Sequence, residues 1–237
     1  MKPPPASWLA KLLFTLLAFI PPADGAHFMP DPPPGQLIDA GGHNLHIVCV
    51  GSGAPVVILD SGVGGFSLEW TAVQRLLATE TRVCAYDRAG YAWSDPGPLP
   101  RTTGNLVKEL HSLLHNAGLA PPYILAGHSF GGYNALYFAK RFPEEIAGLV
   151  LVDSSHPEQT ERLPDLPARR NSLRSSTMVT FFQGQSNLER YPEDILPMVM
   201  HALSSLPWQR TQREETMNFA LSAQQVRSAG QIGRAHV

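Results

Sequence analysis

The sequence has little charge and neither a long basic run nor an apolar run long enough for a comfortable membrane span. Charged residues make up 16% of the 237 residues, below the roughly one quarter of typical soluble domains, which suits a largely buried sheet. The net charge is -2 without a basic run, which argues against a nucleic-acid partner. The apolar run 8–20 is interrupted by Lys11 and Thr15 and is too short to span a bilayer comfortably.

Cysteine is also scarce, since Cys49 and Cys84 are the only two. In an exported protein such a pair suggests a disulfide. The alternative is two small buried apolar side chains on strands. The residues alone leave both interpretations open.

The N-terminal segment has the pattern of a targeting sequence. Lys2 precedes the apolar run, and a Pro-Pro break with small residues follows at 21–26, as in a secretory signal peptide. We therefore expect residues 1–26 to be a signal peptide or an N-terminal anchor, and the protein to be periplasmic or secreted. It would touch a membrane only through this segment, if uncleaved. Residues 27–35 are predicted to form a Pro-rich linker.

Short apolar runs alternate with helical patterns along the middle of the chain. The first two runs form a hairpin around Gly41 and Gly42, and strands alternating with helices after them predict a mostly parallel, doubly wound α/β sheet. The runs are 36–40, 44–50, 56–59, 81–86, 123–126 and 146–152.

The stretch Gly127-His128-Ser129-Phe130-Gly131 matches the G-x-S-x-G nucleophile elbow. A buried strand precedes it and a helix follows it, which is the setting that the motif requires. Glycines on either side prevent collisions in the sharp turn, and the helix N-terminus offers positive charge to an oxyanion. Ser129 is therefore predicted to be a nucleophile.

A glycine-rich loop, 61–65, follows the third strand and precedes a helix that Ser67 is expected to cap. Its position favours donation of a backbone N–H to an oxyanion hole. No Lys-Ser/Thr pair follows the glycines, which argues against a phosphate loop. After the next strand, Asp87 and Arg88 are expected to pair and hold their loop.

The histidines are given no metal or catalytic role from the sequence. His43 and His46 are expected to face solvent on the hairpin. His111 and His115 are spaced to share one helix face, but no third ligand accompanies them. We expect neither a metal nor another cofactor.

These motifs occur in the order found in α/β-hydrolase-fold serine hydrolases of the esterase and lipase type, which the chain resembles over 36–153. The resemblance implies that Ser129 attacks a small-molecule acyl substrate, and that the Phe130 and Val63 amides bind the oxyanion. It also places the strand of Cys49 beside that of Cys84, which favours the disulfide.

The sequence departs from this family after the sixth strand. The family places an acid and then a histidine after two further strands, so we expect a C-terminally truncated chain that lacks the last two strands. Asp153 is the candidate acid, with support of its loop as the alternative. His128, His156 and His201 are not expected to act as the base. We expect residues 232–237, which include His236, to be a translated sequencing adapter, so His236 is not counted as a base.

The predicted organisation is a core at 36–156 and a helical lid at 157–231, with one long helix over 208–229. The predicted function is hydrolysis of carboxylic esters or similar acyl compounds through an acyl-enzyme on Ser129. The alternatives are a truncated or degenerate hydrolase that binds without turnover, or an aminopeptidase, acyltransferase or perhydrolase of the same fold. We expect little esterase activity from these 237 residues, and poor solubility because the strand 146–152 would form an apolar edge.

Overall fold

The computed structural model describes residues 32–159, 188 and 191–231. The predicted segment 1–26, the first part of the linker, much of the predicted lid and residues 232–237 lie outside this part of the chain. Within the described ranges, no helix combines the length and the apolar character that crossing a membrane demands.

The centre of the structure is a six-stranded sheet with the strand order β1-β2-β4-β3-β5-β6. β2 is antiparallel to both β1 and β4, whereas β4, β3, β5 and β6 run parallel. The expected mostly parallel sheet is therefore confirmed. The strands are β1 (Gln36–Asp39), β2 (Asn44–Val50), β3 (Val56–Asp60), β4 (Val83–Tyr86), β5 (Tyr123–His128) and β6 (Ile146–Val152).

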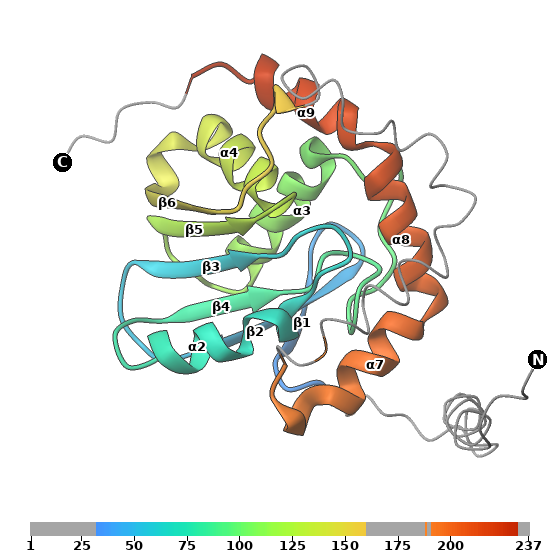
Figure 1. The fold of residues 1–237 in the computed structure, drawn as a ribbon. Coiled ribbons are helices and arrows are strands. Elements are labelled where there is room, and N and C mark those ends of the chain that lie inside the picture. The colour runs from blue at the N-terminus through green and yellow to red at the C-terminus, as the bar shows by residue number, and fades with distance from the viewer. Residues whose placement is uncertain (1–31, 160–187, 189–190, 232–237) are drawn as a thin grey trace, which may run out of the picture.

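Helices cover both faces of this sheet (Figure 1). On one face, α3 (Thr103–Asn116) and α4 (Gly131–Arg141) pack on a core that includes Ile58. On the other face, η1 (Ser67–Trp70) and α2 (Thr71–Leu77) pack on a core that includes Leu59. Neighbouring residues of β3 point to opposite faces, which explains why the whole strand is buried and why it is apolar from Val56 to Leu59. The short helix η2 (Pro143–Glu145) leads into β6.

The C-terminal helices lie around one side of this core (Figure 1). η5 (Glu193–Ile195) leads into α7 (Leu196–Ser204), followed by α8 (Leu206–Met217) and α9 (Phe219–Ser228). α8 lies beyond the carboxyl ends of the parallel strands (Figure 1), and α9 packs against α3 and α4.

The prediction of a single long helix over 208–229 is wrong, because the helix breaks at Asn218. The backbone of Asn218 has φ -94° and ψ 8°, and its amide Nδ2 donates to the Glu214 carbonyl at 2.8 Å. Asparagine side chains compete for backbone groups in this way and so favour helix ends. The break lets α8 and α9 take different directions across the core.

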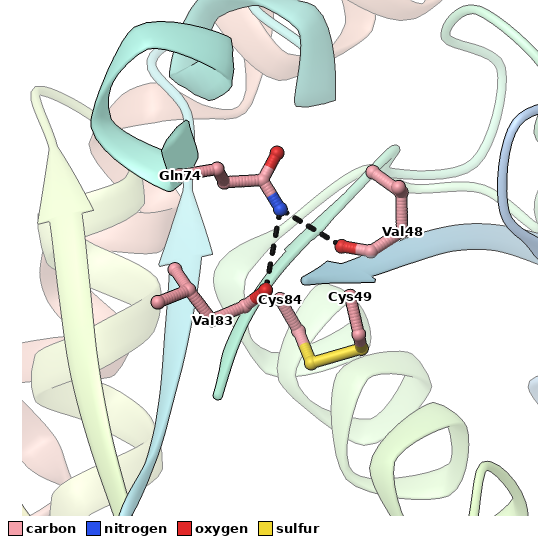
Figure 2. Close-up of a disulfide and its surroundings, with 5 residues drawn as sticks. All are labelled: Val48, Cys49, Gln74, Val83 and Cys84. Atoms are coloured by element: carbon pink, nitrogen blue, oxygen red, sulfur yellow. Dashed lines mark hydrogen bonds between the residues drawn. A yellow bond between two sulfur atoms is a disulfide. The ribbon is translucent and has the colours of Figure 1, made fainter. Parts of the chain in front are cut away.

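Cys49 and Cys84 lie opposite each other on β2 and β4 and form a disulfide with an S–S distance of 2.07 Å (Figure 2). Gln74 of α2 bridges the same two strands, because its Nε2 donates to the carbonyls of Val48 and Val83 (Figure 2). One covalent bond and one amide therefore tie the hairpin to the parallel part of the sheet.

Candidate active site

Ser129 stands at a sharp bend between β5 and α4. Its φ of 50° lies in the left-handed region, which non-glycine residues adopt only at a cost. A Cβ on Gly127 would lie 2.4 Å from the Gly131 carbonyl oxygen, and a Cβ on Gly131 would lie 2.3 Å from the Asp60 oxygen. The two glycines are therefore required by close backbone contacts. Among the described residues, Ser129 Oγ has no hydrogen-bond partner.

The bend is tied to the end of β6 by two backbone hydrogen bonds. The Ser129 N–H donates to the Val152 carbonyl at 3.2 Å, and the Ser155 N–H donates to the Ser129 carbonyl at 3.0 Å. Asp153 follows β6 as Ser129 follows β5, and it also has a positive φ, 41°. Its side chain is exposed and has no hydrogen-bond or ionic partner in the described part of the chain. The structure thus places Asp153 near the elbow, and no histidine of the described residues pairs with its carboxylate.

The glycine-rich loop passes directly beside the serine. A Cβ on Gly62 would lie 3.2 Å from the Ser129 Cβ. Within residues 32–159 and 191–231, neither the Val63 nor the Phe130 backbone N–H donates to any acceptor, although Phe130 is fully buried. Buried backbone donors are normally paired. Two unpaired amides beside a serine side chain are the arrangement that an oxyanion hole requires.

Arg88 is buried behind this loop and binds it directly. Its Nη1 donates to the Ser61 carbonyl and its Nη2 to the Gly62 carbonyl, both at 2.6 Å. Its Nη1 also donates to Asp60 at 2.7 Å, and its Nε and Nη2 bind the two Glu215 carboxylate oxygens at 2.8 and 3.0 Å. The sequence suggested neither carboxylate as a partner of Arg88.

The protonation of this cluster follows from burial and charge. Burial lowers the pKa of Arg88, but the attraction of Glu215 and then Asp60 outweighs it and raises the pKa well above its ordinary value. Burial raises the pKa of the Asp60 carboxyl, although Arg88, Tyr86 and Asn134 favour its charged form. The guanidinium therefore remains charged, and it is the fixed positive centre behind the loop.

Asp87 does not pair with Arg88, and two further expectations fail at the same place. Asp87 accepts from the Ser67 N–H at 2.7 Å and is hydrogen-bonded to His46 Nδ1 at 2.8 Å. His46 is fully buried rather than solvent-facing, because a buried carboxylate requires partners. Ser67 is the first residue of η1 and does not cap it with its side chain.

No described histidine hydrogen-bonds to Ser129 Oγ. His156 is exposed, and its Nδ1 accepts from the Glu158 N–H at 3.2 Å. His111 binds Glu145 at 3.0 Å and stacks on Phe142. Within the described ranges, no three His, Cys, Asp or Glu residues gather in a way that could hold a metal. The described histidines are His43, His46, His111, His115, His128, His156 and His201.

A doubly wound, mostly parallel sheet with a sharp strand-to-helix elbow is typical of the class of α/β hydrolases. The chain belongs to this family, because the model described as "alpha/beta hydrolase fold" matches residues 55–196, more than half of the sequence. An AB hydrolase superfamily protein of Gibberella zeae is 34% identical over 113 residues, which cover 46% of this chain and 35% of that protein. The matches cover only 20% to 41% of the length of four curated relatives.

Two solved structures show the same fold. Cfl2 of Burkholderia cenocepacia is 22% identical with a TM-score of 0.67, over 83% of this chain and 76% of that chain. A thermophilic esterase of Thermogutta terrifontis is 24% identical with a TM-score of 0.57, over 76% and 67% respectively. At these identities the likeness bears on the fold alone.

Proposed function

We propose that Ser129 is the nucleophile of a hydrolase that cleaves carboxylic esters or similar acyl compounds. The observation that carries the proposal is the pair of unpaired backbone amides, Val63 and Phe130, beside a serine hydroxyl that has no partner among the described residues. Donors held in advance at the place where negative charge develops contribute most to such catalysis.

The chemistry proceeds in two halves. Ser129 Oγ attacks the acyl carbon and gives its proton to a base, while the carbonyl oxygen takes up negative charge between the two amides. The carbonyl re-forms as the alcohol or amine leaves with a proton, which leaves an acyl-enzyme. Water then attacks the acyl carbon, and the acid and the free serine are released.

The second candidate is a hydrolase relative that binds acyl compounds without turnover. It is favoured by one observation, that no described histidine contacts Ser129 Oγ. In subtilisin, removal of the catalytic histidine costs about 10⁶-fold in kcat. We therefore expect slow acylation and little multiple turnover from these 237 residues.

Labelling with a fluorophosphonate tests the nucleophile, and hydrolysis of p-nitrophenyl butyrate separates the two candidates. We expect mass spectrometry to find one phosphonyl group on the Ser129 peptide, none there in Ser129→Ala, and none in urea-unfolded protein. Multiple turnover that Ser129→Ala abolishes supports the hydrolase, whereas labelling without turnover supports the binder. Absence of label on Ser129 in the folded protein overturns the proposal.

A further inference from the structure

The loop that carries Val63 needs an external support. Val63 is surrounded by Gly62, Gly64 and Gly65, and Gly64 has a φ of 80°. The sequence therefore allows the backbone many conformations here. An amide in such a loop stabilises an oxyanion only when its direction is fixed beforehand. The loop supplies part of this support itself, because the Gly65 N–H donates to the Gly62 carbonyl at 3.0 Å. The rest must come from residues outside the loop.

Arg88 supplies this support through the Gly62 carbonyl. In a trans peptide the C=O of one residue and the N–H of the next point in opposite directions. When Arg88 Nη2 holds the Gly62 oxygen at 2.6 Å, the Val63 N–H is directed away from the guanidinium. A charged donor on the carbonyl also polarises the peptide and strengthens its N–H as a donor.

Arg88 is in turn fixed by α8. Glu215 is fully buried on this helix and binds the guanidinium through both oxygens. Glu215 also accepts from the Tyr91 hydroxyl at 2.8 Å, and that hydroxyl accepts from the Gly64 N–H at 3.1 Å. The Arg88 guanidinium and the Tyr91 hydroxyl therefore both donate to the Glu215 carboxylate.

Trp208 provides a second contact between α8 and the same loop. Its Nε1 donates to the Gly64 carbonyl at 2.7 Å. Trp208 and Glu215 are seven residues apart on one helix, so they lie on the same face two turns apart. α8 thus binds the Gly64 carbonyl directly through Trp208, and it holds the Gly64 N–H indirectly, because Glu215 binds the Tyr91 hydroxyl.

We propose that Arg88 is a positioning residue that aims the Val63 amide into the oxyanion hole, and that α8 locks this arrangement through Glu215 and Trp208. The hole is then complete only while α8 is seated on the core. This inference deepens the proposed function and rests on it, but it also makes a claim about the direction of the Val63 amide that is testable without catalysis.

The main experiment compares Arg88→Lys with Arg101→Lys. Arg101 is an equally buried arginine that binds Glu109 through two hydrogen bonds of 2.6 and 2.8 Å, and its other acceptor is the Pro98 carbonyl. Lysine keeps the charge but lacks the planar fork that holds several acceptors at once. Both variants lose a buried bidentate pair, but only Arg88→Lys loses its hold on the oxyanion loop.

The first readout is the rate of Ser129 phosphonylation by a fluorophosphonate, whose phosphoryl oxygen gains charge during the attack. We expect Arg88→Lys to lower kinact about 100-fold, the effect of losing one oxyanion donor, with KI changed much less. Arg101→Lys is expected to stay within twofold of the wild type. Equal rates for Arg88→Lys and the wild type overturn the inference and leave the proposed function standing.

The second readout is the ¹H–¹⁵N resonance of the Val63 amide, which reports its environment whether or not Ser129 reacts. We expect this resonance to move in Arg88→Lys and to stay in place in Arg101→Lys. If the wild type is never labelled, the proposed function fails, and an unmoved Val63 resonance then overturns this inference as well.

Trp208→Phe keeps the inference testable if Arg88→Lys does not fold. It keeps an aromatic ring and removes the donor to Gly64 together with part of the indole ring system. We expect the Val63 and Gly64 resonances to move and labelling to slow several-fold. Unchanged resonances and an unchanged rate would overturn the coupling to α8.

Discussion

Arg88 and Glu215 form a buried two-pronged ion pair across 127 residues of sequence, with Nε and Nη2 donating to the two carboxylate oxygens at 2.8 and 3.0 Å. Arg88 follows β4 and Glu215 belongs to α8, so the pair joins the sheet to a C-terminal helix. The same guanidinium binds the Ser61 and Gly62 carbonyls. Stability of the C-terminal helices and geometry of the candidate site therefore depend on one cluster.

Replacement of Glu215 by alanine should strongly destabilise the protein. Among the described residues, it leaves the buried Arg88 charge with only Asp60 as a carboxylate partner, and removal of one member of a buried pair costs about 3–5 kcal/mol. Arg75→Ala breaks an ion pair with Asp194 whose side chains are 57% and 63% exposed, and exposed pairs contribute about 0–1 kcal/mol. Urea unfolding curves measure both changes. Similar losses in the two variants would contradict the assigned role of Glu215.

The elbow and the positions of the strands along the chain were predictable because their signals are local. Gly127, Ser129 and Gly131 carry the motif within five residues, and apolar runs mark each strand. The partners of Arg88 were not predictable, because neighbours in sequence suggested Asp87 whereas folding brings Asp60 and Glu215. A charged side chain at a strand end is paired by the tertiary fold, and single-sequence patterns do not record that.

The burial of His46 was missed for a related reason. Its place on an amphipathic hairpin favours exposure, and only the pairing of β2 with β4 brings Asp87 to its Nδ1. The break of the C-terminal helix at Asn218 did have a local signal, since asparagine favours helix ends. That signal is weak beside a continuous helical pattern.

The disulfide should contribute measurably to stability. Cys49 and Cys84 enclose a separation of 35 residues, for which the chain-entropy model gives about 3–4 kcal/mol. We expect a reducing agent to lower the urea midpoint of the wild type and to leave a Cys49→Ala/Cys84→Ala variant unchanged. If the reductant lowers the urea midpoint of neither protein, the disulfide does not contribute to stability. A lower midpoint in both proteins would reveal an effect of the reductant that is unrelated to the disulfide.

Tyr123 should make the stability depend on alkaline pH. Burial, and then the charge of Glu145, raise its pKa from 10.0 to about 12, and its hydroxyl donates to the Leu119 carbonyl at 2.7 Å. The folded state thus holds a proton that the unfolded state loses above pH 10. The stabilisation is complete below pH 10 and is lost as the pH rises towards 12. Unfolding free energies measured between these limits should fall less steeply for Tyr123→Phe, and parallel curves would refute the assignment.

Alanine at Gly127 should disrupt the elbow, whereas alanine at Gly148 should not. The new Cβ at Gly127 would lie 2.4 Å from the Gly131 oxygen, but at Gly148 its nearest neighbour is Ile124 Cγ1 at 3.8 Å. We expect Gly127→Ala to cost about 1–3 kcal/mol through overpacking and to slow labelling of Ser129. Gly148→Ala on the neighbouring strand should be neutral or stabilising by about 0.4–1 kcal/mol. Thermal unfolding measures the stability of both variants, and equal melting temperatures would rule out the predicted clash at Gly127.

The edge strand β6 should drive self-association. Among the described residues β6 pairs only with β5, and Val150, Leu151 and Val152 are 48%, 46% and 40% exposed. An unpaired apolar edge offers backbone hydrogen bonds to a second strand. We expect light scattering to show association that grows with protein concentration.

Lysine on this edge should suppress the association, because a second strand would then have to bury a charge. The test variant is Val150→Lys/Val152→Lys, whose changes lie two residues apart and so on one face of β6. The control is Leu76→Lys, since Leu76 is 76% exposed but lies on α2, which packs against the interior strand β4. Because Leu76 is the more exposed residue, a reduction in scattering by both variants would indicate general apolar contact. A reduction by the β6 variant alone would identify strand pairing at the edge as the cause.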